Sequence, residues 1–310
     1  MAMKLHQAHQ SNLIDPIGST RPLLIAPAAV AALGLLFAAP PALAGDTGEP
    51  VRQYTQSNLS LSGPVRPIDD DDDDEDEIPF DVADVYAELN NTDGDLGFHA
   101  LIDGDAWKRL EIEDPNERKL LNVNVRGSLR KQGLTELFFE SAEPPFDELT
   151  PEEFFARFAE GEYEIEGKTL DGEELESTDL FWHVMPAPAE PTVNRQAMAE
   201  VCDEGDPNYD VTVTGSPVTI AWDPVTTNHP EIGAPGEIIP ALYQVVVEAE
   251  LEVDGEEFTS VFSVELPPDA TAMTIPQEVI ELSDSFKYEV LVKEKIGGNQ
   301  VAVESCFIIE

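Results

Sequence analysis

Apolar and polar residues alternate with a period of two through much of the chain from residue 80 onward. In segments 83–89, 98–102 and 121–126, every second side chain is apolar. Side chains of a β-strand point alternately to its two faces, so this pattern is typical of strands with one buried and one solvated face. The sequence therefore predicts a mainly β protein made of antiparallel sheets, which form two β-sandwich-like domains.

One short helix is expected within the first of these domains, over about residues 150–159. Thr150 can act as its N-cap, Pro151 suits the first helical position, and Glu153 can close a capping box with Thr150. The phenylalanines that follow share one helical face, so we expect this helix to pack on a sheet.

The start of the chain has the pattern of an export signal. Lys4 and Arg21 precede an apolar run over 23–39, which is followed by Ala42-Leu43-Ala44. A charged region, an apolar region and small residues at the cleavage position are typical of a secretory signal peptide. We predict a signal peptide over residues 1–44 and a secreted or periplasmic protein. The alternative is an uncleaved leader that holds the protein at a membrane.

The chain is strongly acidic, with 63 Asp and Glu against 17 Lys and Arg and a net charge of −46. Residues 69–77 are nine consecutive carboxylates. Like charges at this density repel one another and keep the backbone extended, so residues 45–79 are predicted to be a disordered acidic linker. The charge also excludes nucleic acid as a default partner, because phosphate binding depends on Lys and Arg.

The remaining chain divides at a proline-rich segment. Residues 185–191 read Met-Pro-Ala-Pro-Ala-Glu-Pro, and such a density of prolines interrupts a sheet. This predicts a β-rich domain of unknown family over 80–185, a connector over 186–205, and a second domain over 206–310.

The second domain resembles fibronectin type III, a family of immunoglobulin-like β-sandwiches. Residues 218–224, with Trp222 followed closely by a proline, resemble its second strand, and residues 243–247 resemble its third. Leu282 stands six residues before Tyr288, as in the tyrosine corner of such sandwiches. The resemblance implies structural roles for Trp222, Leu282 and Tyr288, with the Tyr288 hydroxyl bonded to upstream backbone. It also implies an adhesive, spacer or presentation role with no catalytic residues.

Two cysteines, Cys202 and Cys306, bracket the second domain. In an oxidising compartment such a pair is expected to form a disulfide, and the alternative is two free structural thiols. Two cysteines are too few for a zinc site of four thiolates.

Carboxylates and an asparagine at alternate positions near two glycines give a candidate calcium site. Calcium is bound by oxygen ligands at such positions, where a glycine allows a sharp turn. The alternative is ordinary turn formation, for which Asp-Gly pairs are well suited. The candidate ligands are Asn91, Asp93, Asp95, Asp103 and Asp105.

No motif of a nucleophilic enzyme, a phosphate-binding loop or a histidine metal pair occurs in the sequence. We therefore predict a non-catalytic exported protein for binding, adhesion or display, with a protein or glycan partner and no cofactor other than calcium. One alternative is an accessory or catalytic part of a secreted hydrolase with its site in residues 80–185. The other is a calcium-binding secreted protein.

Overall fold

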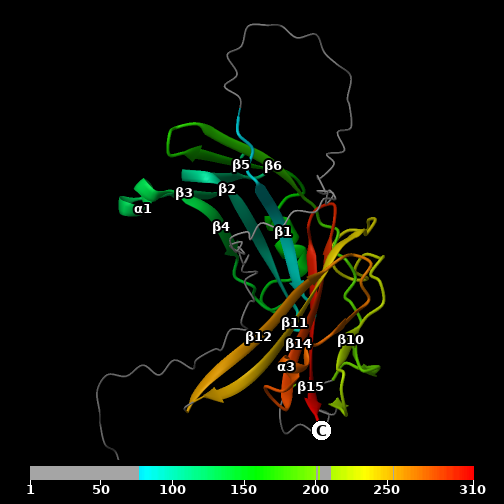
Figure 1. The fold of residues 1–310 in the computed structure, drawn as a ribbon. Helices are drawn as coiled ribbons and strands as arrows, with labels where there is room; N and C mark the ends of the chain where they lie inside the picture. The colour runs from blue at the N-terminus through cyan, green and yellow to red at the C-terminus, as the bar shows by residue number, and fades with distance from the viewer. Residues whose placement is uncertain (1–76, 200–201, 203–210, 254) are drawn as a thin grey trace, which may run out of the picture. The chain divides into compact units, whose positions relative to one another are not determined.

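The computed structural model describes residues 77–199, 202, 211–253 and 255–310 (Figure 1). The described residues contain fifteen strands and three short helices, which confirms the predicted mainly β fold. The signal peptide of residues 1–44 and nearly all of the acidic linker lie outside the described residues. No helix among the residues that the structure describes is long and apolar enough to span a membrane.

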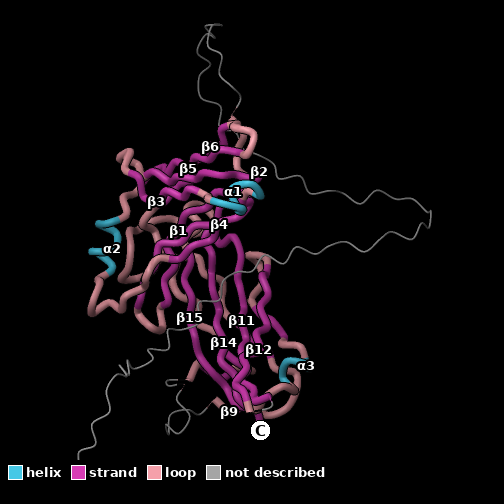
Figure 2. Tube along the Cα trace, turned by 90° about the vertical axis from the view of Figure 1, so that its left-hand side faces the viewer, coloured by secondary structure: helices cyan, strands magenta, loops and turns pink. Residues whose placement is uncertain are grey.

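Most strands belong to one sheet of eleven strands, whose main path runs β12-β11-β14-β15-β1-β2-β5-β6, with β3 and β4 on β2 and β9 on β15. Figure 2 shows β15, β14, β11 and β12 side by side. The strands are β1 (Val82–Asn90), β2 (Asp95–Glu113), β3 (Lys119–Asn124), β4 (Leu134–Glu140), β5 (Gly161–Thr169), β6 (Glu174–Phe181), β9 (Thr212–Val213), β11 (Pro240–Val253), β12 (Glu256–Leu266), β14 (Ser285–Glu294) and β15 (Gln300–Ile309).

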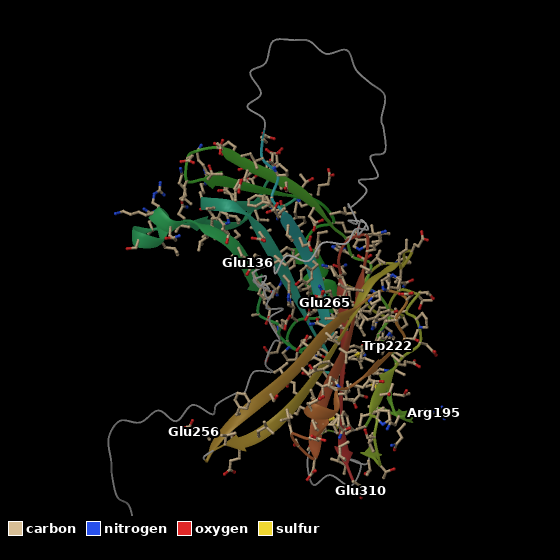
Figure 3. The ribbon with its side chains drawn as sticks, viewed as in Figure 1. Glu136, Arg195, Trp222, Glu256, Glu265 and Glu310 are labelled. Atoms are coloured by element: carbon tan, nitrogen blue, oxygen red, sulfur yellow. A yellow bond between two sulfur atoms is a disulfide. The ribbon has the colours of Figure 1, made fainter. Side chains whose placement is uncertain are left out.

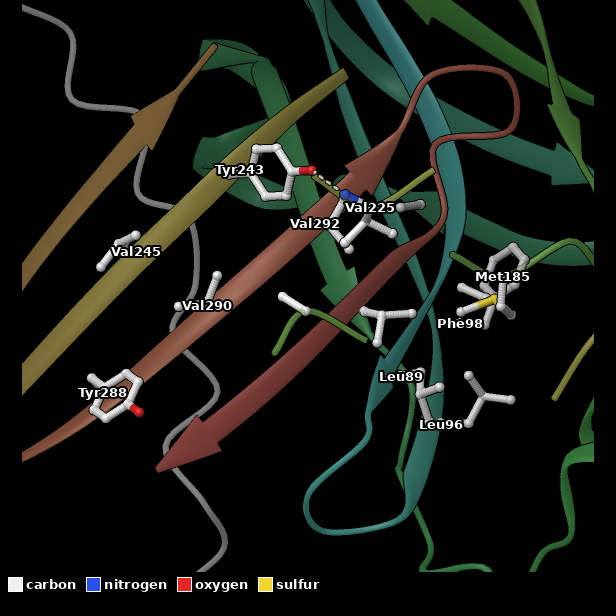
Figure 4. Packing of buried hydrophobic residues seen from close by; sticks show 14 of the residues in the cluster. Leu89, Leu96, Phe98, Met185, Val225, Tyr243, Val245, Tyr288, Val290 and Val292 are labelled. Atoms are coloured by element: carbon white, nitrogen blue, oxygen red, sulfur yellow. Dashed lines mark hydrogen bonds between the residues drawn. The ribbon is translucent and has the colours of Figure 1, made fainter. Parts of the chain in front are cut away.

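A second sheet of four short strands lies against part of the first. Its order is β13-β10-β7-β8, with β13 (Ala272–Thr274), β10 (Thr219–Ala221), β7 (Thr192–Val193) and β8 (Gln196–Ala197). Trp222, directly after β10, packs on Tyr243 of β11 with ring centroids 5.3 Å apart. The Tyr243 hydroxyl accepts a hydrogen bond from the Val225 backbone N–H at 2.8 Å (Figure 4). This buried layer between two sheets forms a β-sandwich.

The helices are α1 (Gly127–Gln132), α2 (Pro151–Arg157) and α3 (Gln277–Ile280). α2 is the helix predicted from the sequence, and its capping box is formed between Thr150 and Glu153. Its aromatic face packs on the sheet, where Phe158 stacks on Phe98 of β2 with ring centroids 4.6 Å apart.

The large sheet joins the two predicted domains. β1 lies beside β15 in a parallel pairing that sets Glu88 against Gln300. The chain divides into two compact units, and the second, Asp69–Glu310, contains all of the described residues. Part of the proline-rich connector also forms strands, because β7 and β8 belong to the smaller sheet. The division into two domains at residues 186–205 therefore stays a prediction.

A cluster of buried polar side chains lies at the seam between β1 and β15, where the two parts of the large sheet meet. The Asn299 side chain accepts a hydrogen bond from the Ala87 N–H at 2.8 Å and donates to the carbonyls of Trp182 and Val184 at 2.9 and 3.0 Å. The Glu294 carboxylate accepts from the Trp182 indole N–H at 2.8 Å. Both Asn299 and Glu294 are fully buried, so strands from distant parts of the chain share one satisfied hydrogen-bond network.

The three residues that the fibronectin type III resemblance singled out differ in their surroundings. Trp222 and Tyr288 are buried, whereas Leu282 is 43% exposed and does not belong to the core. The Tyr288 hydroxyl donates to no backbone carbonyl of the described residues. The expected bond from Tyr288 to upstream backbone is therefore not formed. Tyr243, which packs on Trp222, does bond to backbone, because its hydroxyl accepts from the Val225 N–H.

Candidate binding site

One face of the large sheet is lined by ionisable side chains from five adjacent strands, and four of these side chains are carboxylates. Strand pairing places these side chains on the same face, because Glu289 stands directly opposite Glu304 and Glu88 is paired beside Gln300. We call this surface the acidic face. It comprises Glu248 of β11, Glu289 of β14, Glu304 of β15, Glu88 of β1 and His99 of β2.

His99 lies deep in the acidic face and is only 3% exposed. Its Nε2 is 2.9 Å from Glu143 Oε1, and its Nδ1 is 4.0 Å from Glu88 Oε2. Burial lowers the pKa of His99, but the Glu143 hydrogen bond and the charge of Glu88 outweigh that effect and raise it. When it is protonated, the His99 ring offsets part of the negative charge of these two neighbouring carboxylates.

Elsewhere on the acidic face, Lys287 opposes the rise in the pKa of Glu248 and of Glu304. No basic group of the described residues does the same for Glu289. Burial, reinforced by Glu88, Glu304 and Glu248, raises the pKa of Glu289 to about 8. Next to the acidic face, at the start of β2, burial and neighbouring carboxylates, Glu143 first among them, raise the pKa of Asp95 to about 7. Carboxylates set directly opposite each other on a sheet repel, so this face is a site where positive charge would be stabilised.

Replacement of Glu289 by glutamine is expected to stabilise the protein at high pH. The pKa of Glu289 is raised in the folded state, so its contribution to stability falls as pH rises from about 4.5 to about 8. The expected gain in the free energy of unfolding is about 2 kcal/mol at pH 9 and close to zero at pH 4, a figure discounted for the partial exposure of the side chain. Chemical denaturation at both pH values measures this gain.

The exposed Glu190 provides the control for this substitution. Glu190→Gln should change the free energy of unfolding by the same small amount at pH 4 and at pH 9. A Glu289→Gln variant that is no more stable than the wild type at pH 9 would contradict the repulsion described here.

The candidate calcium ligands divide between two places. Asn91, Asp93 and Asp95 lie in and beside the turn between β1 and β2, whereas Asp103 and Asp105 lie eight or more residues further along β2. At about 3.3 Å per residue, Asp95 and Asp103 are about 26 Å apart along the strand. The structure therefore does not bring the five residues together. Asp103-Gly104-Asp105 is also not a turn, because β2 continues through it.

Among the described residues, no group of three or more His, Cys, Asp and Glu side chains is arranged to hold a metal ion. The predicted cysteine pair is joined, with a disulfide between Cys202 and Cys306. The disulfide joins Cys202 to Cys306 of β15.

The far end of the large sheet is the second feature with binding character. β12 is the last strand of its path, and among the described residues it pairs with β11 alone. A strand in this position has one edge whose backbone N–H and C=O groups are unpaired. Glu256 and Glu265 lie near the two ends of this strand (Figure 3).

Apolar side chains are exposed along this edge. Phe258 is 57% exposed and Val261 is 49% exposed, and Val253 of the adjoining strand is 55% exposed. Because large apolar side chains on a long edge strand invite pairing with another chain, β12 combines backbone and side-chain features of an interaction site. We call residues 256–266 with this unpaired edge the β12 edge.

Sequence reasoning did not single out the residues of either surface. Glu88 could have been placed on the same face as Tyr86 by alternation, but its neighbours Glu289 and Glu304 come from strands whose register the sequence does not reveal. For β12, the alternation over Phe258–Leu266 was the available signal.

No protein-family model matches the chain, and no curated protein sequence matches it. Among solved structures, it is similar to Dpr11 IG1 bound to DIP-gamma IG+IG2, with 9% identity, a TM-score of 0.19, and coverage of 74% of this chain and 98% of that chain. A Dscam structure has 12% identity and a TM-score of 0.17, with coverage of 76% and 44%. Trypsin-activated alpha-2-macroglobulin from Escherichia coli has 12% identity and a TM-score of 0.23, with coverage of 74% and 15%.

Two of these three are structures of immunoglobulin-like domains, and the likeness concerns fold alone. The chain spans only 15% of the alpha-2-macroglobulin chain and 44% of the Dscam chain. The β-sandwich of this protein is defined by its own packing, in which Trp222 after β10 contacts Tyr243 of β11.

Proposed function

We propose that the chain is an exported, non-catalytic binding protein that engages a protein partner along the β12 edge. The observation that carries the proposal is the edge of the eleven-residue strand β12, which no strand of the described residues covers and which bears exposed Phe258 and Val261. A partner strand can satisfy the open backbone groups of such an edge while it covers the apolar side chains, which is the strand-addition mode of peptide recognition.

Export is supported by two features of the chain. The first is the leader pattern of residues 1–44, with its apolar run and Ala42-Leu43-Ala44. The second is the Cys202–Cys306 disulfide, because disulfides persist in oxidising compartments.

A non-catalytic role is supported by the ion pairs that two buried carboxylates of residues 80–185 form. Glu111 is ion-paired with Arg109 at 2.7 Å and also with Lys119. The Asp114 carboxylate accepts a hydrogen bond from Arg118 Nε at 2.8 Å. Burial alone would raise the pKa of Asp114, but the hydrogen bonds from Arg118 outweigh burial and lower it. These ion pairs engage both carboxylates in fixed structural contacts, which leaves them unavailable as free acid–base groups.

Affinity capture with the full chain tests the proposal. The bait is compared with a Phe258→Ser/Val261→Thr variant, which removes the apolar side chains of the edge. Leu129 of α1 is 48% exposed, so Leu129→Ser removes an equally exposed apolar side chain elsewhere. We expect proteins of the source organism's extracellular fraction that bind the wild type to bind the Leu129→Ser variant equally and the edge variant at least ten-fold less. Equal capture by all three would overturn the proposal.

A further inference from the structure

We infer that the β12 edge accepts an extended segment of another protein that carries Lys or Arg at two positions eight residues apart on one face. This inference rests on the proposed function and specifies the partner segment. It follows from the order of side chains along β12, from the charge around the strand, and from the repulsion that opposes pairing of β12 with a second copy of itself.

The two faces of β12 have different characters. Phe262, Val264 and Leu266 pack against the core, so even-numbered residues of the strand lie on its core side. Phe258 lies on the same side, but beyond the packed part of the core, where it stays 57% exposed. Odd-numbered residues point to the opposite face, which is the one that continues the acidic face through Glu248 of β11. These outward residues are Glu257, Thr259, Val261, Ser263 and Glu265.

Carboxylates therefore stand at both ends of the outward row, and the middle of that row is apolar or neutral. Glu257 is also directly opposite Glu252 of β11, so the distal end holds two like charges side by side. Opposite charges on neighbouring strands stabilise a pairing, and like charges destabilise it. A segment with Lys or Arg opposite Glu257 and opposite Glu265 would neutralise both ends, and β-branched residues between them would cover Val261.

A second copy of this chain is a poor occupant of the same edge. Antiparallel pairing of β12 with itself over its whole length sets Val261 against Val261 of the other copy. In that register Glu257 of each copy faces Glu265 of the other, which gives two directly opposed carboxylate pairs. The net charge of −46 adds a general repulsion between copies. Charge thus disfavours self-pairing and favours a basic partner.

A peptide of designed sequence is the direct probe. It is blocked at both ends, about eleven residues long, and alternates Val and Thr, with two lysines eight positions apart on one face. The comparison peptide has glutamate in place of both lysines. Fluorescence anisotropy with the full chain at low salt should show the lysine peptide binding at least ten-fold more tightly. Equal affinities for the two peptides would overturn the inference.

Variants of the chain distinguish binding at the β12 edge from attraction of the peptide to the overall negative charge of the protein. In Glu257→Gln/Glu265→Gln we expect the preference for the lysine peptide to fall below about three-fold. Glu136→Gln/Glu162→Gln removes two exposed carboxylates from other strands and should leave the preference unchanged. If both double variants reduced the preference equally, the attraction would belong to the whole acidic surface and the inference would fall.

The inference and the proposed function can fail separately. If Phe258→Ser/Val261→Thr abolishes capture of native proteins but the lysine and glutamate peptides bind alike, the function stands and the charge pattern is wrong. If that variant leaves capture unchanged, the proposed function itself is wrong.

Discussion

Replacement of Asn299 by alanine is expected to lower the free energy of unfolding by about 3 kcal/mol or more. The side chain is fully buried and bonds to three backbone groups, which are the Ala87 N–H and the Trp182 and Val184 carbonyls. Each buried polar group left without a partner costs about 1–3 kcal/mol. For a chain of this size, such a loss corresponds to a fall in Tm of about 10 °C.

Thermal and denaturant unfolding of the variant measure this effect. Asn116 is exposed in the loop after β2, and Asn116→Ala should change the free energy of unfolding by less than about 0.5 kcal/mol. An Asn299→Ala variant that loses less than 1 kcal/mol would show that the seam between β1 and β15 is not held by this network.

Reduction of the Cys202–Cys306 disulfide is expected to destabilise the protein by about 4 kcal/mol. The bond joins residues 104 apart in sequence, and closing a loop of this length removes much conformational freedom from the unfolded chain. In the chain-entropy account the stabilisation grows with loop length, which places this bond at the high end of the usual range.

The control is a variant that lacks both sulfurs, Cys202→Ser/Cys306→Ala. Denaturant unfolding with and without reductant should differ for the wild type and should not differ for this variant. Two thiols titrated in the unfolded, unreduced wild type, or an unfolding midpoint that ignores reductant, would contradict the presence of the bond.

Local signals in the sequence predicted much of the fold. Alternation located strands such as β1. The capping residues Thr150 and Glu153 located α2. These features depend on neighbours within a few residues, so sequence alone determines them.

Long-range pairing could not be predicted in the same way. β1 meets β15 in a parallel register that depends on contacts more than two hundred residues apart, such as Ala87 with Asn299. The acidic face depends on that register, because Glu88, Glu289 and Glu304 come together only through it. The spacing of Leu282 before Tyr288 matched a known motif, yet Leu282 is exposed, since spacing alone does not fix which side chain the core takes up.

Hydrogen exchange along β12, resolved by residue in the free protein, tests the central claim most directly. β12 pairs with β11 on one side only among the described residues, and in antiparallel pairing alternate residues direct their N–H groups away from the partner. We expect slow and fast amides to alternate from Glu256 to Leu266, whereas β14, paired on both sides, should be protected throughout. Uniform protection along β12 would mean that its edge is already occupied, and would contradict the account.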